Sequence, residues 1–317
     1  MSGRIDVHHH FLPPEYVAAW GEDTLAKTAA AGRLFGWSVA RTLDLMGFAG
    51  IETAMLSISS PGFRLGDPDR ARLCRFCNDL AAGIGRDHPG RFGMFANLPL
   101  PDLDLALTEI EYGLDVLGAD GVTLYSNYQG RHLGDPGLQP MWQELNRRKA
   151  VVYVHPTQPA GGGWVPGISV STLEFPFETT RTIVSLLYHG TPERFPDIRF
   201  IFSHAGGAMP YLAGRVATLS DVNPNFRQRG FAAVIPALRR FHYDITQAAN
   251  PYTFRALLEL VPVSQLLFGS DIPFASQSQI GLTITGLAEL GLEPDQVLAI
   301  DRDNALALFA RFAGPAT

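Results

Sequence analysis

The sequence predicts an α/β protein, a (β/α)8 TIM barrel with a small insertion after the first strand. Eight short segments rich in β-branched and apolar residues recur along the 317 residues, and longer amphipathic stretches separate them. Segments such as "VVYV" and "FIF" have the continuous apolar character of strands that are buried on both faces. Eight strands alternating with helices over this length are typical of such a barrel. A doubly wound open sheet is the alternative, which the strand ends must decide.

The predicted strands alternate with helical segments whose ends carry turn residues. The strands occupy residues 4–7, 52–58, 92–98, 121–126, 151–154, 199–203, 242–245 and 265–269. Residues 69–84 show a clear helical period, because apolar side chains recur on one face from Leu73 to Ile84. We expect helices to stop at Gly85, at Gly118 and at the prolines of residues 192–196.

The connection after the first strand is long for a single strand-to-helix loop. We interpret residues 11–37 as an insertion over the mouth of the barrel, followed by the first helix near residues 38–48. Long loops of this kind tend to be functional. Residues 1–317 are otherwise expected to form one domain.

Composition excludes several classes of protein. The net charge of -6 argues against a nucleic-acid partner, because phosphate binding needs a basic surface. No apolar run approaches the roughly 18 residues of a membrane span. Charge and histidines occupy the first ten residues, where a signal peptide would carry its apolar core. Two cysteines do not make a disulfide framework. We therefore expect a cytoplasmic protein with no nucleic-acid or membrane partner.

Lysine is scarce, and this limits the chemistry. Lys27 and Lys149 are the only lysines among the 25 basic residues. Schiff-base and pyridoxal enzymes need a lysine in the site. The glycine-rich motifs that cradle nucleotide phosphates do not occur in the sequence. We therefore expect no organic cofactor.

Polar residues gather at the predicted strand ends, where barrel enzymes place their chemistry. His8 and His10 follow the first strand with one residue between them, so both imidazoles should face the barrel axis while His9 points away and is structural. Two imidazoles with no carboxylate between them suit a borderline divalent metal.

Two further strand ends complete a candidate metal site. His155 ends the fifth predicted strand, and Asp271 follows the eighth, where an unpaired buried charge would be costly unless a metal were bound. Three histidines and one carboxylate make a mononuclear site with room for water or substrate. His204 ends the sixth strand, before two glycines that would admit a ligand close to the backbone. We interpret it as a proton-transfer residue, with a fifth ligand as the alternative and Asp244 as a candidate to orient it.

These residues, in this order, resemble the metal-dependent amidohydrolase superfamily. The resemblance is strongest to its decarboxylase branch, typified by aminocarboxymuconate semialdehyde, γ-resorcylate and 6-methylsalicylate decarboxylases. The stretches that carry it are "IDVHHHFLP", "ELNRRKAVVYVHPT", "FPFETT", "RFPDIRFIFSHAGGAMPYLAGR" and "LLFGSDIPF". They extend over residues 5–274, nearly the whole chain.

The resemblance implies one zinc ion per subunit, with manganese as the alternative, and a homodimer. The implied metal ligands are His8, His10, His155 and Asp271. Binuclear members of the superfamily bridge their metals with a carboxylated lysine after the fourth strand, but this chain has Tyr125-Ser126-Asn127 there. It also has Ala30 where the semialdehyde decarboxylases place a carboxylate-binding arginine. One metal and an aromatic monocarboxylate are therefore expected.

The expected activity is that of a carboxy-lyase, the non-oxidative decarboxylation of a salicylate-type acid such as a 6-methylsalicylate-like compound. In this hypothesis the metal chelates the carboxylate and the ortho hydroxyl, and Asp271 or His204 protonates the ring carbon. The candidate substrate-binding residues are Asn127, Trp164, Arg215 and Phe274. Two alternatives stay open: a mononuclear metal-dependent hydrolase of a lactone or amide, and a non-catalytic metal-binding protein.

Overall fold

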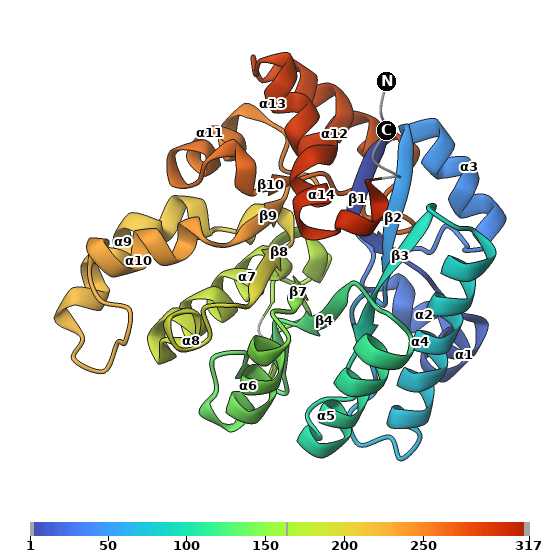
Figure 1. Ribbon diagram of the computed structural model, residues 1–317, viewed down its shortest axis with the longest axis horizontal. Coiled ribbons are helices and arrows are strands. Elements are labelled where there is room, and N and C mark those ends of the chain that lie inside the picture. Colours follow the sequence, from blue (N-terminus) through green and yellow to red (C-terminus); the bar gives the residue numbers. More distant parts are fainter. Residues whose placement is uncertain (1–2, 163, 314–317) are drawn as a thin grey trace.

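A barrel of eight parallel strands forms the centre of the computed structural model, which describes residues 3–162 and 164–313 (Figure 1). The strands pair in the order β1-β2-β3-β4-β7-β8-β9-β10. Their bounds are β1 Arg4–His10, β2 Ile51–Ser57, β3 Phe92–Asn97, β4 Gly121–Tyr125, β7 Val151–His155, β8 Arg199–Phe202, β9 His242–Asp244 and β10 Leu266–Leu267. All eight predicted strands are present, although the first extends three residues further, to His10, and the last pairs over only two residues.

The barrel closes where β1 meets the segment that continues β10. The Val7 amide donates to the Phe268 carbonyl at 3.0 Å, and the His10 amide donates to the Ile272 carbonyl at 2.7 Å. His9 and Ile272 form a further parallel bridge. A closed ring of parallel strands excludes the open doubly wound sheet, and the predicted fold class is confirmed.

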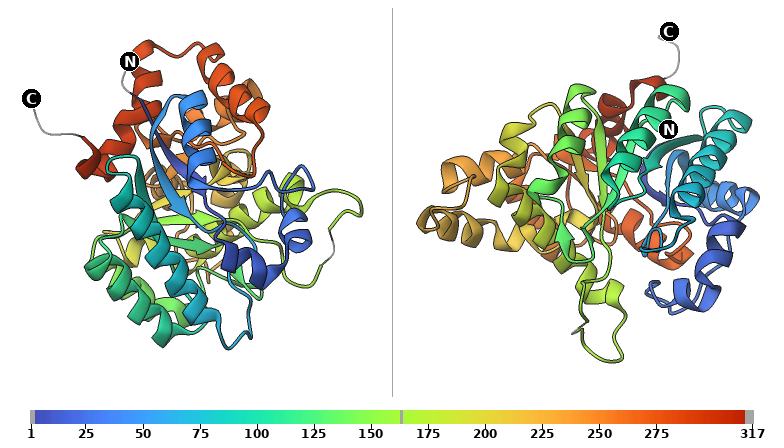
Figure 2. Two further views of the ribbon diagram at one scale, coloured as in Figure 1. Left: turned by 90° about the vertical axis from the view of Figure 1, so that its right-hand side faces the viewer. Right: turned by 90° about the horizontal axis from the view of Figure 1, so that it is seen from below.

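Helices surround the strands on the outside of the barrel (Figures 1 and 2). They are α1 Pro14–Trp20, α2 Glu22–Ala26, α3 Val39–Ala49, α4 Arg70–Asp87, α5 Leu103–Glu111, α6 Gln139–Arg147, α7 Val170–His189, α8 Thr191–Arg194, α9 Met209–Val222, α10 Phe231–Arg239, α11 Pro251–Leu260, α12 Gln277–Glu289, α13 Pro294–Leu298 and α14 Asn304–Leu308. Within the described residues, none of these helices combines the length and apolar character that crossing a membrane would require.

The helix ends agree with the turn residues at two of the three predicted stops. Gly118, at φ 68°, follows the α5 region, and α7 ends before Gly190, which has φ 67° and lies just ahead of the predicted prolines. The predicted stop at Gly85 is wrong. Helix α4 continues through it to Asp87, because Gly85 has ordinary helical geometry and the chain turns only at Gly90, at φ 76°.

The segment between β1 and α3 contains the two short helices α1 and α2. The Tyr16 hydroxyl and the Trp20 indole N–H both donate to the Gly62 carbonyl at 2.8 Å, which ties α1 to the loop after β2. Figure 2 shows α1, α2 and the described residues of the loop after β7, 158–162 and 164–169, on the same side of the barrel. A two-stranded antiparallel hairpin, β5 Asn127–Tyr128 and β6 Arg131–His132, follows β4.

The C-terminal helices close the opposite mouth of the barrel. Phe309 and Phe312 belong to one buried cluster with inward-facing strand residues such as Ile5 and Phe95. The Phe95 and Phe309 rings lie 5.8 Å apart between centroids. Arg311 pairs with Asp120, directly before β4. Chemistry is thereby confined to the other mouth, at the C-terminal ends of the strands.

Phe309→Ala should lower the free energy of unfolding by about 3–5 kcal/mol, since it removes a buried aromatic ring and leaves a cavity. Urea unfolding measures the change. The matched control is Phe48→Ala on α3, where the ring is 56% exposed and little stability should be lost. Equally small losses of stability in both variants would contradict the conclusion that Phe309 helps to fill this mouth of the barrel.

Candidate metal centre

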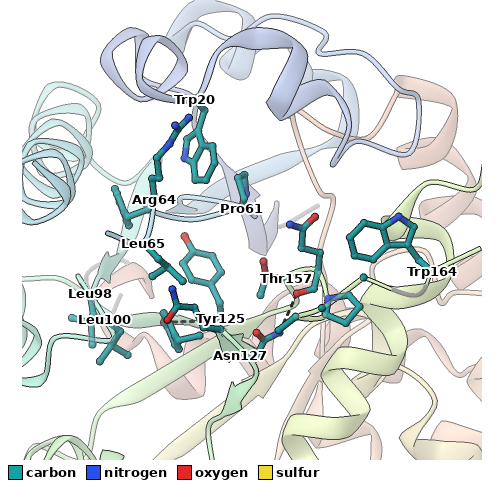
Figure 3. Close-up of a pocket in the computed structure, with 18 residues that line it drawn as sticks. Trp20, Pro61, Arg64, Leu65, Leu98, Leu100, Tyr125, Asn127, Thr157 and Trp164 are labelled. Atoms are coloured by element: carbon teal, nitrogen blue, oxygen red, sulfur yellow. Dashed lines mark hydrogen bonds between the residues drawn. The ribbon is translucent and has the colours of Figure 1, made fainter. Parts of the chain in front are cut away.

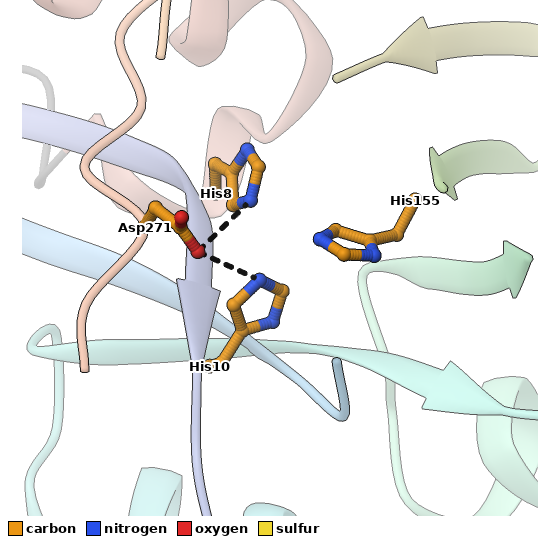
Figure 4. A group of neighbouring side chains, drawn as sticks. All are labelled: His8, His10, His155 and Asp271. Carbon is orange, nitrogen blue, oxygen red and sulfur yellow. Dashed lines mark ion pairs between the residues drawn. The ribbon is translucent and has the colours of Figure 1, made fainter. Parts of the chain in front are cut away.

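Four potential metal ligands lie together at the C-terminal mouth of the barrel (Figure 4). The ligand atoms of the group all lie within 4.8 Å of one another, and the four residues are His8, His10, His155 and Asp271. One carboxylate oxygen of Asp271, Oδ1, lies 3.5 Å from Nε2 of both His8 and His10. The structure therefore brings together all four residues that the sequence predicts as ligands.

The alternation of side chains along β1 explains why two of its three consecutive histidines join the cluster. The His8 and His10 rings lie 4.9 Å apart between centroids. His9 faces away and donates from Nδ1 to Asp6 Oδ2 at 2.8 Å. Asp6 also accepts the backbone amides of His8 and Ser270, so His9 belongs to the buried network that joins β1 to the last strand. The predicted structural role of His9 agrees with these contacts.

Each histidine of the cluster is oriented by a hydrogen bond from its outer nitrogen. Nδ1 of His8 donates to Asp244 Oδ2 at 2.9 Å, and Nδ1 of His10 lies 3.0 Å from the Ser57 hydroxyl. Nδ1 of His155 donates to the Pro156 carbonyl at 2.7 Å. Partners of this kind fix the tautomer and leave Nε2 as the coordinating atom.

The donor atoms fit a divalent transition metal. Among the described residues, Nε2 of His8 and Nε2 of His10 are buried without a hydrogen-bond partner, which is costly unless another group occupies the space between them. Burial and the neighbouring histidines hold the pKa of His10 well below its usual value, so its ring is neutral. Burial lowers the pKa of His155 as well. The neutral imidazoles of His10 and His155, a third histidine and one carboxylate are ligands suited to zinc or manganese.

Asp244 has a larger role than the sequence suggested. Although burial disfavours a charged ring, the adjacent Asp244 carboxylate raises the pKa of His8 to about 10. Its other oxygen, Oδ1, accepts the backbone amides of His204 at 3.0 Å and Thr246 at 3.1 Å. Asp244 therefore orients the ring of His8 and the main chain of His204. The sequence predicts only the role toward His204.

His204 lies beside the cluster with a free ring nitrogen. Its ring centroid is 4.8 Å from that of His8, and Nδ1 has no hydrogen-bond partner in the described part of the chain. Desolvation by burial, reinforced by the charge of His8, lowers the pKa of His204 to about 4. The imidazole is therefore neutral near pH 7 and can accept a proton.

The glycines after His204 serve the fold rather than a ligand, which corrects the prediction. A Cβ on Gly207 would lie 1.9 Å from the Pro176 carbonyl oxygen, and one on Gly206 would lie 2.7 Å from the Tyr243 ring. Only glycine lets the turn pack this closely against α7 and β9. The space that was expected to admit a ligand is filled by protein.

A very small cavity, with a volume of about 20 Å³, adjoins the cluster. Aromatic walls come from Phe175, whose ring centroid is 6.0 Å from that of His155, and from Phe274, 5.7 Å from that of His10. Residues 28–30 of the segment after β1 also line it. No lysine or arginine is among the described residues that line the cavity. Phe274 thus lies where a substrate-binding residue is expected.

The structure does not bring the other three predicted substrate-binding residues to this cavity. Asn127 and Trp164 line a neighbouring cavity (Figure 3). The Asn127 side chain braces its own loop, because Nδ2 donates to buried Glu178 at 2.6 Å and Oδ1 accepts the Gly130 amide at 3.0 Å. Arg215 lies exposed on α9 and lines neither of these two cavities.

Comparisons with known proteins agree with this geometry. Residues 5–311 match the family model described as Amidohydrolase. The chain is 38% identical to the 6-methylsalicylic acid decarboxylase acuB of Aspergillus aculeatus, over 97% of this chain and 96% of that protein. Among solved structures, 2,6-dihydroxybenzoate decarboxylase from Rhizobium is similar, with a TM-score of 0.83 and 25% identity over 98% of this chain and 99% of that chain.

A further solved structure is similar in fold. The dihydroxybenzoic acid decarboxylase of Polaromonas sp. JS666 was solved with bound manganese and the inhibitor 2-nitroresorcinol. Its TM-score is 0.81 at 22% identity, over 98% of this chain and 97% of that chain, which shows a shared fold.

Asp244→Asn should weaken metal affinity about tenfold to a hundredfold, because the carboxylate that orients His8 is lost while the ligand itself remains. Competition with a chelating dye measures the affinity. The control is Asp303→Asn. Asp303 is exposed and does not belong to the cluster. Unchanged affinity in Asp244→Asn would show that Asp244 does not support the metal site.

Proposed function

The chain belongs to the amidohydrolase family, and on that premise we propose that it is a metal-dependent decarboxylase of an aromatic acid of salicylate type, such as a 6-methylsalicylate-like compound. The observation that carries this proposal is the cluster of three histidines and one aspartate, which opens into a small cavity walled by aromatic rings. The similarity to a 6-methylsalicylic acid decarboxylase, nearly end to end in both chains, supports the reaction class.

His8, His10, His155 and Asp271 would hold one divalent ion, zinc or manganese, per chain. A divalent ion supplies a Lewis acid that binds the carboxylate and ortho hydroxyl of a salicylate and fixes its orientation. No lysine or arginine is among the described residues that line the cavity, so the single carboxylate of the substrate has to be balanced at the metal cluster. A monocarboxylate fits this arrangement better than a dicarboxylate does.

The aromatic walls position the substrate ring. Phe175 and Phe274 are both buried, each forms a T-shaped pair with a histidine ring of the cluster, and both supply apolar surface to the cavity that they line. The side chains also exclude water from the reacting carbon.

His204 and Asp271 are the residues we propose to move the proton. A proton is delivered to the ring carbon that carries the carboxylate, the bond to the carboxyl carbon then breaks, and its electron pair returns to the ring as carbon dioxide leaves. Nδ1 of His204 is free to accept and return a proton. The second oxygen of Asp271, Oδ2, lies 3.4 Å from Nε2 of Gln247 and is the oxygen further from the histidine ligands.

We predict that metal-loaded protein converts 6-methylsalicylate to the corresponding phenol with one carbon dioxide per product. In deuterated water, one deuterium should appear at the ring carbon that lost the carboxylate. Product analysis by NMR and mass spectrometry measures both. Hydrolysis of a lactone or amide, with no carbon dioxide released from any hydroxybenzoate, would instead support the hydrolase alternative.

His204→Ala should lower kcat by about 10²–10⁴-fold, the range expected for loss of proton transfer, with metal content unchanged. The matched control is His88→Ala, which removes a histidine at the end of α4. Steady-state kinetics together with metal analysis separates the two effects. Full turnover by His204→Ala would remove this residue from the mechanism.

Removal of the metal by a chelator should abolish turnover, and one equivalent of zinc or manganese per chain should restore it. The reason is that the divalent ion would supply the Lewis acid that binds the carboxylate and ortho hydroxyl of the substrate. Elemental analysis beside the activity assay gives the stoichiometry. Undiminished activity in protein shown to be free of metal would refute the metal-dependent proposal.

We also propose that the chain forms a homodimer, as the resemblance implies. Large side chains on neighbouring helices are strongly exposed in the single chain, with Tyr211 of α9 86% and Tyr252 of α11 91% accessible. Exposed aromatic side chains are enriched at interfaces between proteins. Light scattering after gel filtration measures the mass of the particle.

A further inference from the structure

A second cavity lies next to the metal cluster, and the proposed reaction does not use it (Figure 3). Its volume is about 450 Å³, against about 20 Å³ for the cavity at the cluster. None of the four metal ligands lines it. Residues from α1, the loop after β2, the β5 region and the loop after β7 form its walls.

The two cavities share a thin wall. Ser59 lines the cavity at the metal cluster, whereas Pro61, two residues later, lines the second cavity. At the end of β7, His155 lines the cavity at the metal cluster, whereas Thr157, two residues later, lines the second cavity. The hydroxyl oxygens of Ser60 and Thr157 lie 3.1 Å apart and join the two halves of the wall. A molecule in the second cavity would therefore lie close to the reaction site.

The walls of the second cavity offer aromatic surface whose polar ends are already satisfied. The Trp20 indole donates to the Gly62 carbonyl at 2.8 Å, and the Tyr125 hydroxyl donates to the Ile58 carbonyl at 3.0 Å. Further apolar lining comes from Phe63, Leu65, Leu98, Leu100 and Trp164. Such a surface favours a flat, apolar ring.

One cation lies at the rim of this cavity without a carboxylate partner. The Arg64 guanidinium lies over the Trp20 ring, 4.7 Å from its centroid, and donates from Nη2 to the Ala19 carbonyl at 3.2 Å. Within the described residues, Arg64 forms no ion pair, whereas Arg75 and Arg148 are paired with acids. A guanidinium placed over an indole can present its remaining N–H groups to an anion.

We propose that the second cavity binds an aromatic carboxylate, with its ring against the aromatic wall and its carboxylate on Arg64. The chemistry of the cavity alone leads to this ligand class, so the inference does not depend on the proposed decarboxylase activity. A site of this kind holds an aromatic acid one wall away from the metal cluster.

The test is calorimetric titration of the metal-loaded protein with benzoate, which has the ring and carboxylate but lacks the ortho hydroxyl that chelates a metal. Arg64→Gln should weaken benzoate binding at the second cavity at least tenfold. The matched control, Arg33→Gln, removes an arginine that lies over Phe35 and lines neither cavity, and it should leave binding unchanged. Benzamide, which is neutral, should bind wild type and Arg64→Gln equally.

A second variant tests the position of the site independently of charge. Leu65→Trp fills the second cavity, so it should also weaken benzoate binding while decarboxylation, if present in wild type, continues. Benzoate affinity that is the same in wild type, Arg64→Gln and Leu65→Trp would overturn the inference. Benzoate binding that depends on Arg64 in a protein without decarboxylase activity would instead leave this inference intact and refute the proposed function.

Discussion

Closure of the barrel between β1 and the segment after β10 is the constraint on which the metal centre depends. The Asp271 amide donates to the His8 carbonyl at 2.8 Å, and the His10 amide donates to the Ile272 carbonyl at 2.7 Å. Three of the four ligand residues therefore occupy adjoining backbone positions. Asp6 strengthens this seam, because it accepts the amide of Ser270 at 3.0 Å and holds the ring of His9. The ligand geometry is thus set by strand pairing.

The two mouths of the barrel have different tasks. At one mouth, buried aromatic residues of the C-terminal helices fill the interior and stabilise it. At the other mouth, two residues have a positive φ, which residues other than glycine rarely adopt. They are His204 at φ 52° and Asp271 at φ 63°. Such positions cost about 1–3 kcal/mol each and cluster at functional sites. The hydrogen bond from the His204 amide to Asp244 helps to hold this conformation.

The sequence predicted the features that depend on local pattern. Strand positions followed from short apolar runs, and the ligands His8, His10, His155 and Asp271 followed from their places at strand ends. The role of Asp244 toward His8 was missed, because it joins residues 236 positions apart in the chain. The structure places Asn127 and Trp164 at a neighbouring cavity and Arg215 on the exposed face of α9. Loop bracing and the exposed face of α9 depend on packing between distant elements, which a linear pattern does not contain.

Anomalous diffraction from crystals of the metal-loaded protein with a bound salicylate tests the central claim most directly. The account predicts one anomalous peak per chain, within about 2.0–2.2 Å of nitrogen atoms from three histidines and a carboxylate oxygen. Those ligands are His8, His10, His155 and Asp271, and the carboxylate of the salicylate should contact the same ion. Two peaks, or a peak elsewhere with the salicylate remote from this cluster, would contradict the account.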